Sequence, residues 1–333
     1  MARILYLHRD PSFAQFIRDD LEILSRSHDV TDVRAEGTFK ASAKLARAAA
    51  RADLIYVWWG DLVGVGGLTL ALLRSKPSVL VTGGYDIADV PEIRYGLKYH
   101  RVRKHLPPLA LRLATRVLAN SDSARSEVVR NYGIDASRID VVPHGFDIDR
   151  YVASAKKERR VLTVGLISRP YIPYKGLRTF VEAARLLPDV PFVHAGPSAG
   201  DGALEELKTM APKNVSFLGF LPTEELLRQL RISLVYAQLS AHEGFGMALA
   251  EAMLSGATPV ATDRGAIPEV AGDVCRYVPY GDAAGTANGI SAALEEPRGA
   301  AARARIAELF PMSRRREGVL RLVDEALQTL RQR

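Results

Sequence analysis

A regular alternation of short apolar runs with amphipathic stretches constrains the fold of this chain more than any other sequence feature. Runs such as Leu54–Trp58 and Val79–Thr82 have the near-continuous apolar character of strands that are buried on both faces. The stretches between them have the periodicity of helices that cover a sheet. The alternation therefore predicts an α/β chain with parallel sheets whose faces carry helices.

The alternation runs twice, with a pause between the two series. In the first half we predict strands at Arg3–His8, Asp29–Val33, Leu54–Trp58, Val79–Thr82, Val117–Ala119 and Ile139–Val142, and helices at Ser12–Ser25, Phe39–Arg51, Leu62–Arg74, Tyr95–Ala114 and Ser123–Asn131. In the second half we predict strands at Val161–Val164, Phe192–Ala195, Val215–Leu218, Ile232–Tyr236, Thr258–Ala261 and Cys275–Val278, and helices at Gly176–Leu187, Leu204–Met210, Glu224–Gln229, Met247–Ser255, Ala283–Glu295 and Ser313–Leu330. The polar stretch Asp149–Arg160 is predicted to be a linker between two domains, residues 1–152 and 160–312.

Composition excludes several classes of protein. Hydrophobic residues make up 47% and charged residues 25%, which is ordinary for a globular chain and excludes a disordered one. The single cysteine, Cys275, excludes an internal disulfide and a cysteine-rich zinc site, and its strand-like context indicates a small buried residue. The N-terminal residues lack the apolar core of a signal peptide, and the apolar run Val63–Leu73 is too short to cross a bilayer of about 30 Å. We therefore expect a cytoplasmic protein.

The richest run of candidate functional residues is His242–Met253, which follows a predicted strand and enters a predicted helix. Gly244 and Gly246 let the backbone come close to a ligand. The first N–H groups of the helix, at the positive end of its dipole, form an anion site. Glu243 lies on the loop and Glu251 about two turns into the helix, so both carboxylates can face one ligand. Carboxylates accept hydrogen bonds from hydroxyl groups and so suit a polyol.

A second candidate loop, Gly165–Leu177, also joins a strand to a helix. It carries Arg169 and Lys175 on a backbone shaped by glycine and proline. The planar fork of an arginine binds two phosphate oxygens at once, and a lysine supplies a point charge. Loop cations are commonly just solvated, but next to the first loop these two supply the grip for a diphosphate.

Together these motifs resemble those of retaining glycosyltransferases with the GT-B fold, specifically glycosyltransferase family 4. The matching residues are Arg169, Lys175-Gly176, Glu243-Gly244-Phe245-Gly246-Met247, Glu251-Ala252, Asp263-Arg264-Gly265-Ala266-Ile267-Pro268-Glu269 and Pro143-His144-Gly145-Phe146-Asp147. The resemblance covers essentially the whole chain and is strongest from about Val161 to Gly272. It implies a GT-B architecture, in which two doubly wound, Rossmann-like domains face a cleft. It also implies that the last helix, within residues 313–333, packs back on the N-terminal domain.

The resemblance assigns a role to each matched residue. Arg169 and Lys175 would bind the donor diphosphate and stabilise it as it leaves, and Glu243 would contact the transferred sugar. The donor-binding residues would be Gly244, Phe245, Gly246, Met247 and Glu251, with Glu251 on the ribose. The donor would be a nucleotide-diphosphate sugar, linked to uridine, guanosine or adenosine, in the C-terminal domain. The acceptor, a sugar, lipid or small molecule, would bind the N-terminal domain.

The chain departs from the family pattern in its N-terminal half. The family often has His-Gly-x-Asp after the fourth strand, whereas this chain has Gly83-Gly84-Tyr85-Asp86. The histidine is therefore absent, and Asp86 is the catalytic candidate that remains there. The Gly-Gly loop that many members have after the first strand is replaced by His8-Arg9-Asp10-Pro11-Ser12.

Two further motifs look like known binding signatures but are not interpreted as binding sites. Asp147-Ile148-Asp149 spells Asp-x-Asp, a metal-diphosphate motif of a different glycosyltransferase fold, but Asp147 already belongs to the matched Gly-x-Asp motif. Arg169 and Lys175 supply the charge that a metal would, so we expect no metal site and no cofactor besides the nucleotide-sugar co-substrate. Gly64-Val65-Gly66-Gly67 is a poor dinucleotide fingerprint, because it does not directly follow a strand.

The formal net charge is +7, and basic residues gather between 94 and 116, where there is no Asp or Glu. Arg101, Arg103 and Lys104 lie there among leucines, and Pro107-Pro108 are predicted to split the segment into two helices. Two interpretations stay open: a solvated helix face, or docking to an anionic membrane or acceptor. Docking would place the protein peripherally at the inner face of the membrane. We expect no nucleic-acid partner, because no helix-turn-helix, RNA-recognition or zinc motif accompanies the charge.

Two alternative functions also stay open. A related GT-B enzyme, such as a nucleotide-sugar epimerase or a phosphorylase, would have similar motifs, and an epimerase would act without an acceptor. A non-catalytic sugar-nucleotide-binding protein would bind donor but neither transfer nor hydrolyse it.

Overall fold

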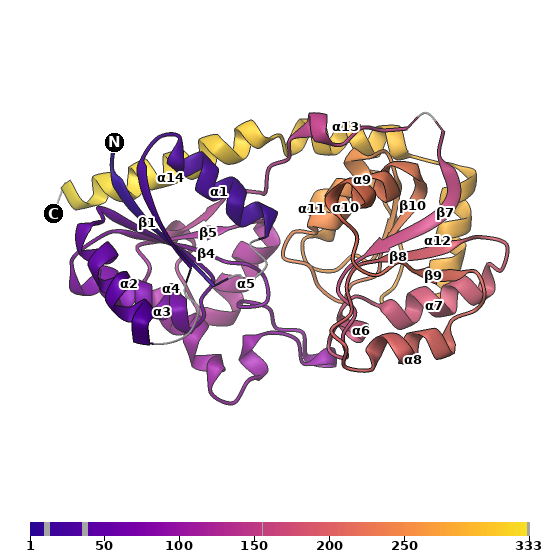
Figure 1. Cartoon of the computed structure of the whole chain (residues 1–333), viewed down its shortest axis with the longest axis horizontal. Coiled ribbons are helices and arrows are strands. Elements are labelled where there is room, and N and C mark those ends of the chain that lie inside the picture. Colours follow the sequence, from indigo (N-terminus) through magenta and orange to yellow (C-terminus); the bar gives the residue numbers. More distant parts are fainter. Residues whose placement is uncertain (10–13, 35–38, 155, 332–333) are drawn as a thin grey trace. The chain divides into compact units, whose positions relative to one another are not determined.

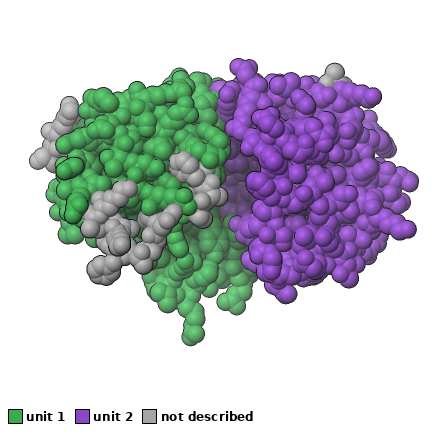
Figure 2. Space-filling model, viewed as in Figure 1, with its two compact units in different colours: residues 1–145, 312–333 green, residues 146–311 purple. Residues whose placement is uncertain are grey.

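The computed structural model describes residues 1–9, 14–34, 39–154 and 156–331, and their side chains except those of 39–44 and 329–331. The chain divides into two compact units, which Figure 2 shows in different colours. Unit 1 comprises residues 1–145 and 312–333, and unit 2 comprises residues 146–311. The boundary thus falls after Gly145, ahead of the predicted linker, and the C-terminal helix belongs to unit 1.

Unit 1 is built on one parallel sheet with the strand order β2-β1-β3-β4-β5-β6 (Figure 1). The strands are β1 (Arg3–His8), β2 (Asp29–Arg34), β3 (Leu54–Trp58), β4 (Ser78–Val81), β5 (Arg116–Ala119) and β6 (Ile139–Val141). The helices are α1 (Gln15–Ser25), α2 (Phe39–Arg51), α3 (Leu62–Leu73), α4 (Leu106–Leu113), α5 (Asp122–Tyr132) and α14 (Met312–Arg331). Short 3-10 turns are η1 (Pro91–Ile93), η2 (Leu97–Tyr99), η3 (Arg103–His105) and η4 (Ala136–Arg138).

Alternate residues of the unit 1 strands enter two separate hydrophobic cores. Leu5, Leu7 and Val57 pack against α2 to α5 on one face of the sheet. Tyr6 and Trp58 pack against α1 and α14 on the other face. Successive strand residues point to opposite faces, so the continuous apolar runs seen in the sequence serve both helical layers at once.

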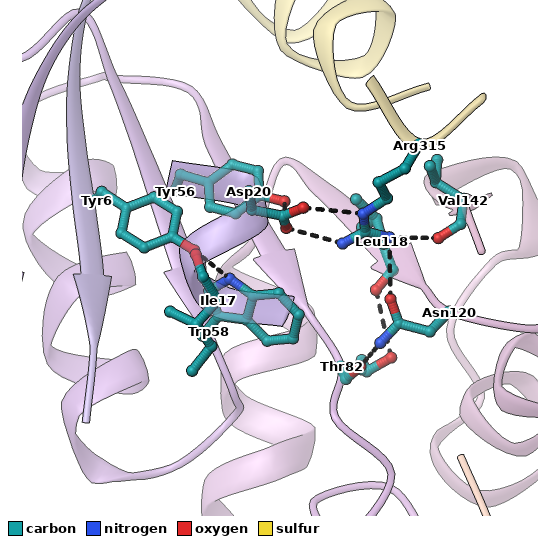
Figure 3. A network of polar contacts seen from close by, with 10 residues as sticks. All are labelled: Tyr6, Ile17, Asp20, Tyr56, Trp58, Thr82, Leu118, Asn120, Val142 and Arg315. Carbon is teal, nitrogen blue, oxygen red and sulfur yellow. Dashed lines mark hydrogen bonds and ion pairs between the residues drawn. The ribbon is translucent and has the colours of Figure 1, made fainter. Parts of the chain in front are cut away.

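A buried ion pair joins α14 to α1 within unit 1. The guanidinium of Arg315 donates to both carboxylate oxygens of Asp20 in α1, at 2.8 and 2.7 Å, and both side chains are at most 1% exposed. Arg315 also donates to the side chain of Asn120 and to the carbonyl of Val142, as Figure 3 shows. Burial opposes the charge of Arg315, but the Asp20 carboxylate outweighs it and raises the pKa of the guanidinium. Tyr56 donates a further hydrogen bond to Asp20, at 2.7 Å.

Unit 2 repeats the architecture with its own parallel sheet, ordered β12-β11-β10-β7-β8-β9. The strands are β7 (Glu158–Val164), β8 (Phe192–Ala195), β9 (Val215–Phe217), β10 (Ser233–Gln238), β11 (Thr258–Ala261) and β12 (Arg276–Tyr277). The helices are α6 (Tyr171–Tyr174), α7 (Leu177–Leu186), α8 (Ala203–Met210), α9 (Thr223–Ile232), α10 (Met247–Leu254), α11 (Ile267–Ala271), α12 (Ala283–Glu295) and α13 (Gly299–Leu309). The 3-10 turns are η5 (Ile148–Arg150) and η6 (Gly272–Val274).

The two faces of the unit 2 sheet are also both covered. Helices α7 and α12 pack on one face around Phe180, Phe192 and Ile290. Helices α9, α10, α11 and α13 pack on the other around Tyr236 and Leu249. The prediction of two doubly wound parallel sheets is therefore confirmed.

The structure corrects the sequence prediction in three places. Glu158–Arg160, predicted as linker, begin β7. The helix predicted over 95–114 is largely absent: η2 and η3 occupy its first part, and the Pro107-Pro108 pair begins α4 instead of splitting a helix. Proline suits the first helical turn, where its missing N–H has no partner to lose. The short helices α6 and α11 and the longer α13 were not predicted. The predicted start of the first helix, Ser12, lies outside the described residues.

No described helix combines the length and the apolar character that a membrane-spanning segment needs.

Candidate functional site

The strand order of unit 2 places a switch point between β7 and β10. From β7 the chain continues to β8 and β9 on one side, and then to β10 and β11 on the other. In open parallel sheets, ligands bind at the carboxyl ends of the strands where the order reverses. The loops that leave β7 and β10 at this point are the two candidate loops identified in the sequence.

Backbone contacts join these two loops. The N–H of Ala241 donates to the carbonyl of Tyr174 at 2.8 Å. Gly176, with φ of 61°, lies so close to the end of β10 that a Cβ there would be 2.2 Å from the carbonyl oxygen of Leu239. A positive φ and the lack of space both require glycine at this position. The close approach brings Lys175 beside Glu243.

Three donors converge on one carboxylate oxygen of Glu243. Its Oε1 accepts from Lys175 Nζ at 2.6 Å, Gln238 Nε2 at 2.6 Å and Ser240 Oγ at 2.7 Å. Its Oε2 has a longer contact, 3.5 Å, with the hydroxyl of Tyr174. The side chain of Glu243 is 10% exposed and that of Lys175 is 17% exposed. Glu243 is therefore held through Oε1 in a largely buried network of charged and neutral hydrogen bonds, which fixes the direction of Oε2.

Arg169, the other predicted cation, is exposed and has different partners. Its Nε donates to the carbonyl of Asp201 at 2.8 Å, and its backbone N–H donates to the Asp201 carboxylate at 2.7 Å. These bonds tie the loop after β7 to the segment before α8. Among the described residues, Arg169 therefore makes no hydrogen bond to Lys175 or Glu243.

The predicted donor-binding residues surround the start of α10. Gly246 is the N-cap, with φ of 101°, so the first N–H groups of α10 begin with that of Met247. The side chain of Phe245 is buried against Phe310, which leaves its backbone on the loop. One oxygen of Glu251, in the second turn of α10, accepts from the hydroxyl of Tyr151 at 3.1 Å. Gly244 lies between Glu243 and Phe245 on the same loop.

Asp86 lies in unit 1 and is 2% exposed. Its carboxylate accepts from the backbone N–H groups of Gly60, Gly83 and Gly84, at 3.1, 2.9 and 3.1 Å. Burial raises the pKa of this carboxyl, although the three N–H groups oppose the shift. These contacts shape the loop after β4, and a role for Asp86 in the reaction stays a prediction.

Trp59 gives a physical reason for glycine at position 83. A Cβ on Gly83 would lie 2.0 Å from the indole Nε1 of Trp59. Trp59 itself has φ of 70°, a left-handed conformation that is rare for a bulky residue. The space that a histidine side chain would need is therefore filled by an indole.

The remaining motifs have structural explanations. Cys275 is buried, and burial raises the pKa of its thiol to about 12, which keeps it a protonated core residue. The carboxylate of Asp147 accepts from the N–H of Asp149 and caps η5. Gly64 to Gly67 lie inside α3. No group of three or more His, Cys, Asp or Glu side chains that could hold a metal occurs among the described residues.

Sequence reasoning missed the partners of the site residues. Gln238, Ser240 and Tyr174 orient Glu243, and Asp201 holds the loop of Arg169. The one signal available was Gln238, a polar residue at the carboxyl end of an otherwise apolar strand, where parallel sheets place their ligand-facing residues.

Two family models match consecutive parts of the chain. "Glycosyl transferases group 1" matches residues 147–308, and "Glycosyltransferase Family 4" matches residues 6–150.

Curated relatives match part of the chain. A D-inositol 3-phosphate glycosyltransferase of Mycobacterium sp. (strain KMS) is 31% identical over 170 residues, which cover 46% of this chain and 38% of the relative. A phosphatidyl-myo-inositol mannosyltransferase of Mycobacterium tuberculosis is 30% identical over 204 residues, which cover 57% of this chain and 53% of the relative. The chain thus spans between about two fifths and half of the length of these relatives.

Solved structures match nearly the whole fold. Anabaena HepE in complex with UDP-glucose superposes with a TM-score of 0.81 at 22% identity, covering 98% of this chain and 100% of that one. A sucrose-phosphate synthase from Thermosynechococcus elongatus superposes with a TM-score of 0.79 at 16% identity, covering 99% and 100%. This likeness confirms the GT-B class of fold. Matched by two models from residue 6 to residue 308, the chain belongs to the glycosyltransferases that they describe, group 1 and family 4.

Proposed function

We propose that the chain is a retaining glycosyltransferase that transfers a sugar from a nucleotide-diphosphate sugar to an acceptor without a metal ion. The observation that carries the proposal is the Lys175–Glu243 pair at the switch point of the unit 2 sheet. Lys175 lies on the loop after β7, and Glu243 lies on the loop that runs from β10 into α10. A cation and a helix N-terminus bind a diphosphate, and an oriented carboxylate binds the hydroxyl groups of a sugar. This site has all three groups side by side.

The proposed chemistry places each group where charge changes. The bond between the anomeric carbon and the diphosphate oxygen breaks as a bond forms from that carbon to the acceptor oxygen. Negative charge develops on the departing diphosphate, which accepts the proton of the acceptor hydroxyl. Lys175 and the first N–H groups of α10 stabilise that charge, with Arg169 as the further cation on the loop after β7. Glu243 accepts hydrogen bonds from hydroxyl groups of the sugar through Oε2, and Glu251 accepts from the ribose.

The same groups are the reason for proposing a reaction that needs no metal ion. Two loop cations and a helix dipole supply the positive charge that a divalent ion supplies in other phosphate sites. We expect full turnover in the presence of a strong chelator. Loss of turnover with EDTA, restored by Mg²⁺ or Mn²⁺, would contradict this part of the proposal.

The related proteins suggest which donors and acceptors to test first. HepE was solved with UDP and with UDP-glucose, so UDP-sugars come before GDP- and ADP-sugars. The names of the curated relatives indicate inositol-containing acceptors. In the proposal, unit 1 binds the acceptor and unit 2 binds the donor. Transfer with an α-linked donor should give an α-linked product, which nuclear magnetic resonance of the purified product distinguishes from inversion.

One observation favours a second candidate, a sugar-nucleotide-binding protein that does not transfer. The position where the family often has histidine is Gly83, and Trp59 fills the space beside it. The two candidates separate in a single assay with radiolabelled donor. A transferase yields a labelled acceptor product, whereas the binding protein retains intact donor with neither transfer nor hydrolysis.

A further inference from the structure

Helix α3 of unit 1 is apolar on all sides. Its sequence from Leu62 to Leu73 contains no charged residue. A helix of this kind is normally buried all round. Here its inner side packs on the sheet through Leu68 and Ala71, but Leu62, Leu72 and Leu73 are 67%, 60% and 74% exposed. Large apolar side chains gathered on one exposed helix indicate an interaction surface.

The neighbours of α3 are basic. Helix α3 packs against α2 on one side and α4 on the other (Figure 1). Neither α2 nor α4 contains an aspartate or glutamate. Arg47 and Arg51 of α2 and Arg112 of α4 are exposed. The leucines of α3 therefore lie between two helices whose charged residues are all cations.

The segment before α4 extends this basic surface. Residues 100–105 are all exposed, and they include Arg101, Arg103 and Lys104. The side chains of these three cations have no ion pair among the described residues. Val102, between them, is 81% exposed. The nearby carboxylate of Asp89 is already occupied by Lys98 and Tyr99.

We propose that this surface of unit 1, formed by α3, α4 and residues 100–105, docks the protein onto an anionic lipid bilayer. Unpaired cations bind the phosphate groups of the lipid, and the exposed leucines and Val102 enter the boundary between headgroups and acyl chains. The combination favours a bilayer over a nucleic acid, because exposed aliphatic side chains gain nothing from a phosphate backbone. The inference does not depend on the proposed transfer reaction.

The test is co-sedimentation of the full chain with vesicles of phosphatidylcholine alone and with an equimolar mixture of phosphatidylcholine and phosphatidylglycerol. We expect sedimentation with the mixed vesicles only, and release at high salt. The triple variant Arg101→Glu, Arg103→Glu, Lys104→Glu should lower the partition coefficient by about 100-fold or more. The pair Leu72→Gln, Leu73→Gln, which leaves the charge unchanged, should lower it by on the order of 10-fold.

Matched controls on unit 2 separate this surface from bulk charge and hydrophobicity. Lys208, Lys213 and Arg231 are exposed cations there, and Leu186 and Phe220 are 53% and 74% exposed. Reversing these three cations, or replacing these two apolar residues by Gln, should leave partitioning within about twofold of the wild type. Tryptophan fluorescence verifies folding of the unit 1 variants, because both tryptophans, Trp58 and Trp59, belong to unit 1.

Four outcomes would overturn the proposal. The wild type could stay in the supernatant with mixed vesicles, or the control triple could lose binding as strongly as the test triple. Self-association through Leu72 and Leu73 without vesicle binding would assign the surface to a second copy of the chain. Retention of a duplex RNA without vesicle binding would assign it to a nucleic acid.

Discussion

The ammonium group of Lys175 lies 2.6 Å from a carboxylate oxygen of Glu243, although 68 positions separate them in the sequence. Two backbone features make this contact: the hydrogen bond from Ala241 to Tyr174, and the close passage of Gly176 against Leu239. Both residues follow strands that are adjacent in the sheet, β7 and β10. The pair thus results from the order of the strands, and in the proposed reaction it joins a cation for the diphosphate to a carboxylate for the sugar.

Replacement of either partner should abolish most turnover. We expect Lys175→Met and Glu243→Gln each to lower kcat by on the order of 10² or more, because each removes a preorganised charge from the transition state. Steady-state kinetics with the donor identified by binding measures the effect. Lys213→Met, an exposed lysine of the same unit, should retain wild-type turnover. Wild-type kcat in either test variant would remove its assigned role.

Gln238 should act by orienting Glu243. Its amide donates to Glu243 Oε1 at 2.6 Å and to Ser240 Oγ at 2.8 Å, and it is 3% exposed. Gln238→Met keeps the size but removes the donor, so we expect kcat to fall about 10-fold while the KM for donor changes little. A purely structural role would instead lower the unfolding temperature and leave kcat per folded molecule unchanged.

The Arg315–Asp20 pair should be critical for the stability of unit 1. Removal of one partner leaves a buried charge, so Arg315→Met should lower the free energy of unfolding by about 3–5 kcal/mol. The double variant Arg315→Met, Asp20→Leu should recover much of the loss, because neither charge remains. Urea denaturation followed by tryptophan fluorescence reports this unit alone, since Trp58 and Trp59 are the only tryptophans. Equal losses in the single and double variants would show that packing of α14, rather than charge, carries the stability.

Burial of His194 should make unit 2 less stable in mild acid. Burial lowers its pKa from 6.5 to about 4, so between these values the unfolded chain binds a proton that the folded chain does not. The free energy of unfolding of unit 2 is therefore unaffected above pH 6.5. It falls by on the order of 3 kcal/mol as the pH falls toward 4. Scanning calorimetry of the wild type and His194→Leu checks this. The pH dependence should be weaker in the variant, and His100→Leu, at an exposed position, should keep the wild-type slope.

The strands were predictable because burial on both faces makes them continuously apolar. Arg3–His8, Leu54–Trp58, Phe192–Ala195 and Thr258–Ala261 have the predicted bounds. Helices α6 and α11 were missed because they are only four and five residues long and each contains a proline. In α13, alanine and arginine leave little apolar periodicity to detect.

The segment 95–105 misled prediction because its basic and apolar residues imitate an amphipathic helix. Gly96 has φ of 124°, and a Cβ there would lie 2.0 Å from the carbonyl of Ala88. Val90 and Tyr95 form an isolated antiparallel bridge. These contacts turn the chain back before Leu97, and the pattern of basic and apolar residues does not reveal them.

The candidate site was predictable only in part. Glu243, Lys175 and Arg169 could be identified as candidates from their residue types and from their positions on loops that follow strands. Their partners Gln238, Ser240 and Asp201 are set by how the loops fold over one another. Apart from the position of Gln238 at the carboxyl end of its strand, that packing has no signal in a single sequence.

Donor binding measured by thermal shift tests the central claim most directly. The wild type and Lys175→Met are melted with a panel of UDP-, GDP- and ADP-sugars. One nucleotide class should stabilise the wild type, by about 2.7 kcal/mol at 100 times its dissociation constant, and should have little effect on Lys175→Met. Flat melting curves across the panel, or equal stabilisation of both proteins, would contradict the assignment of this site to the donor diphosphate.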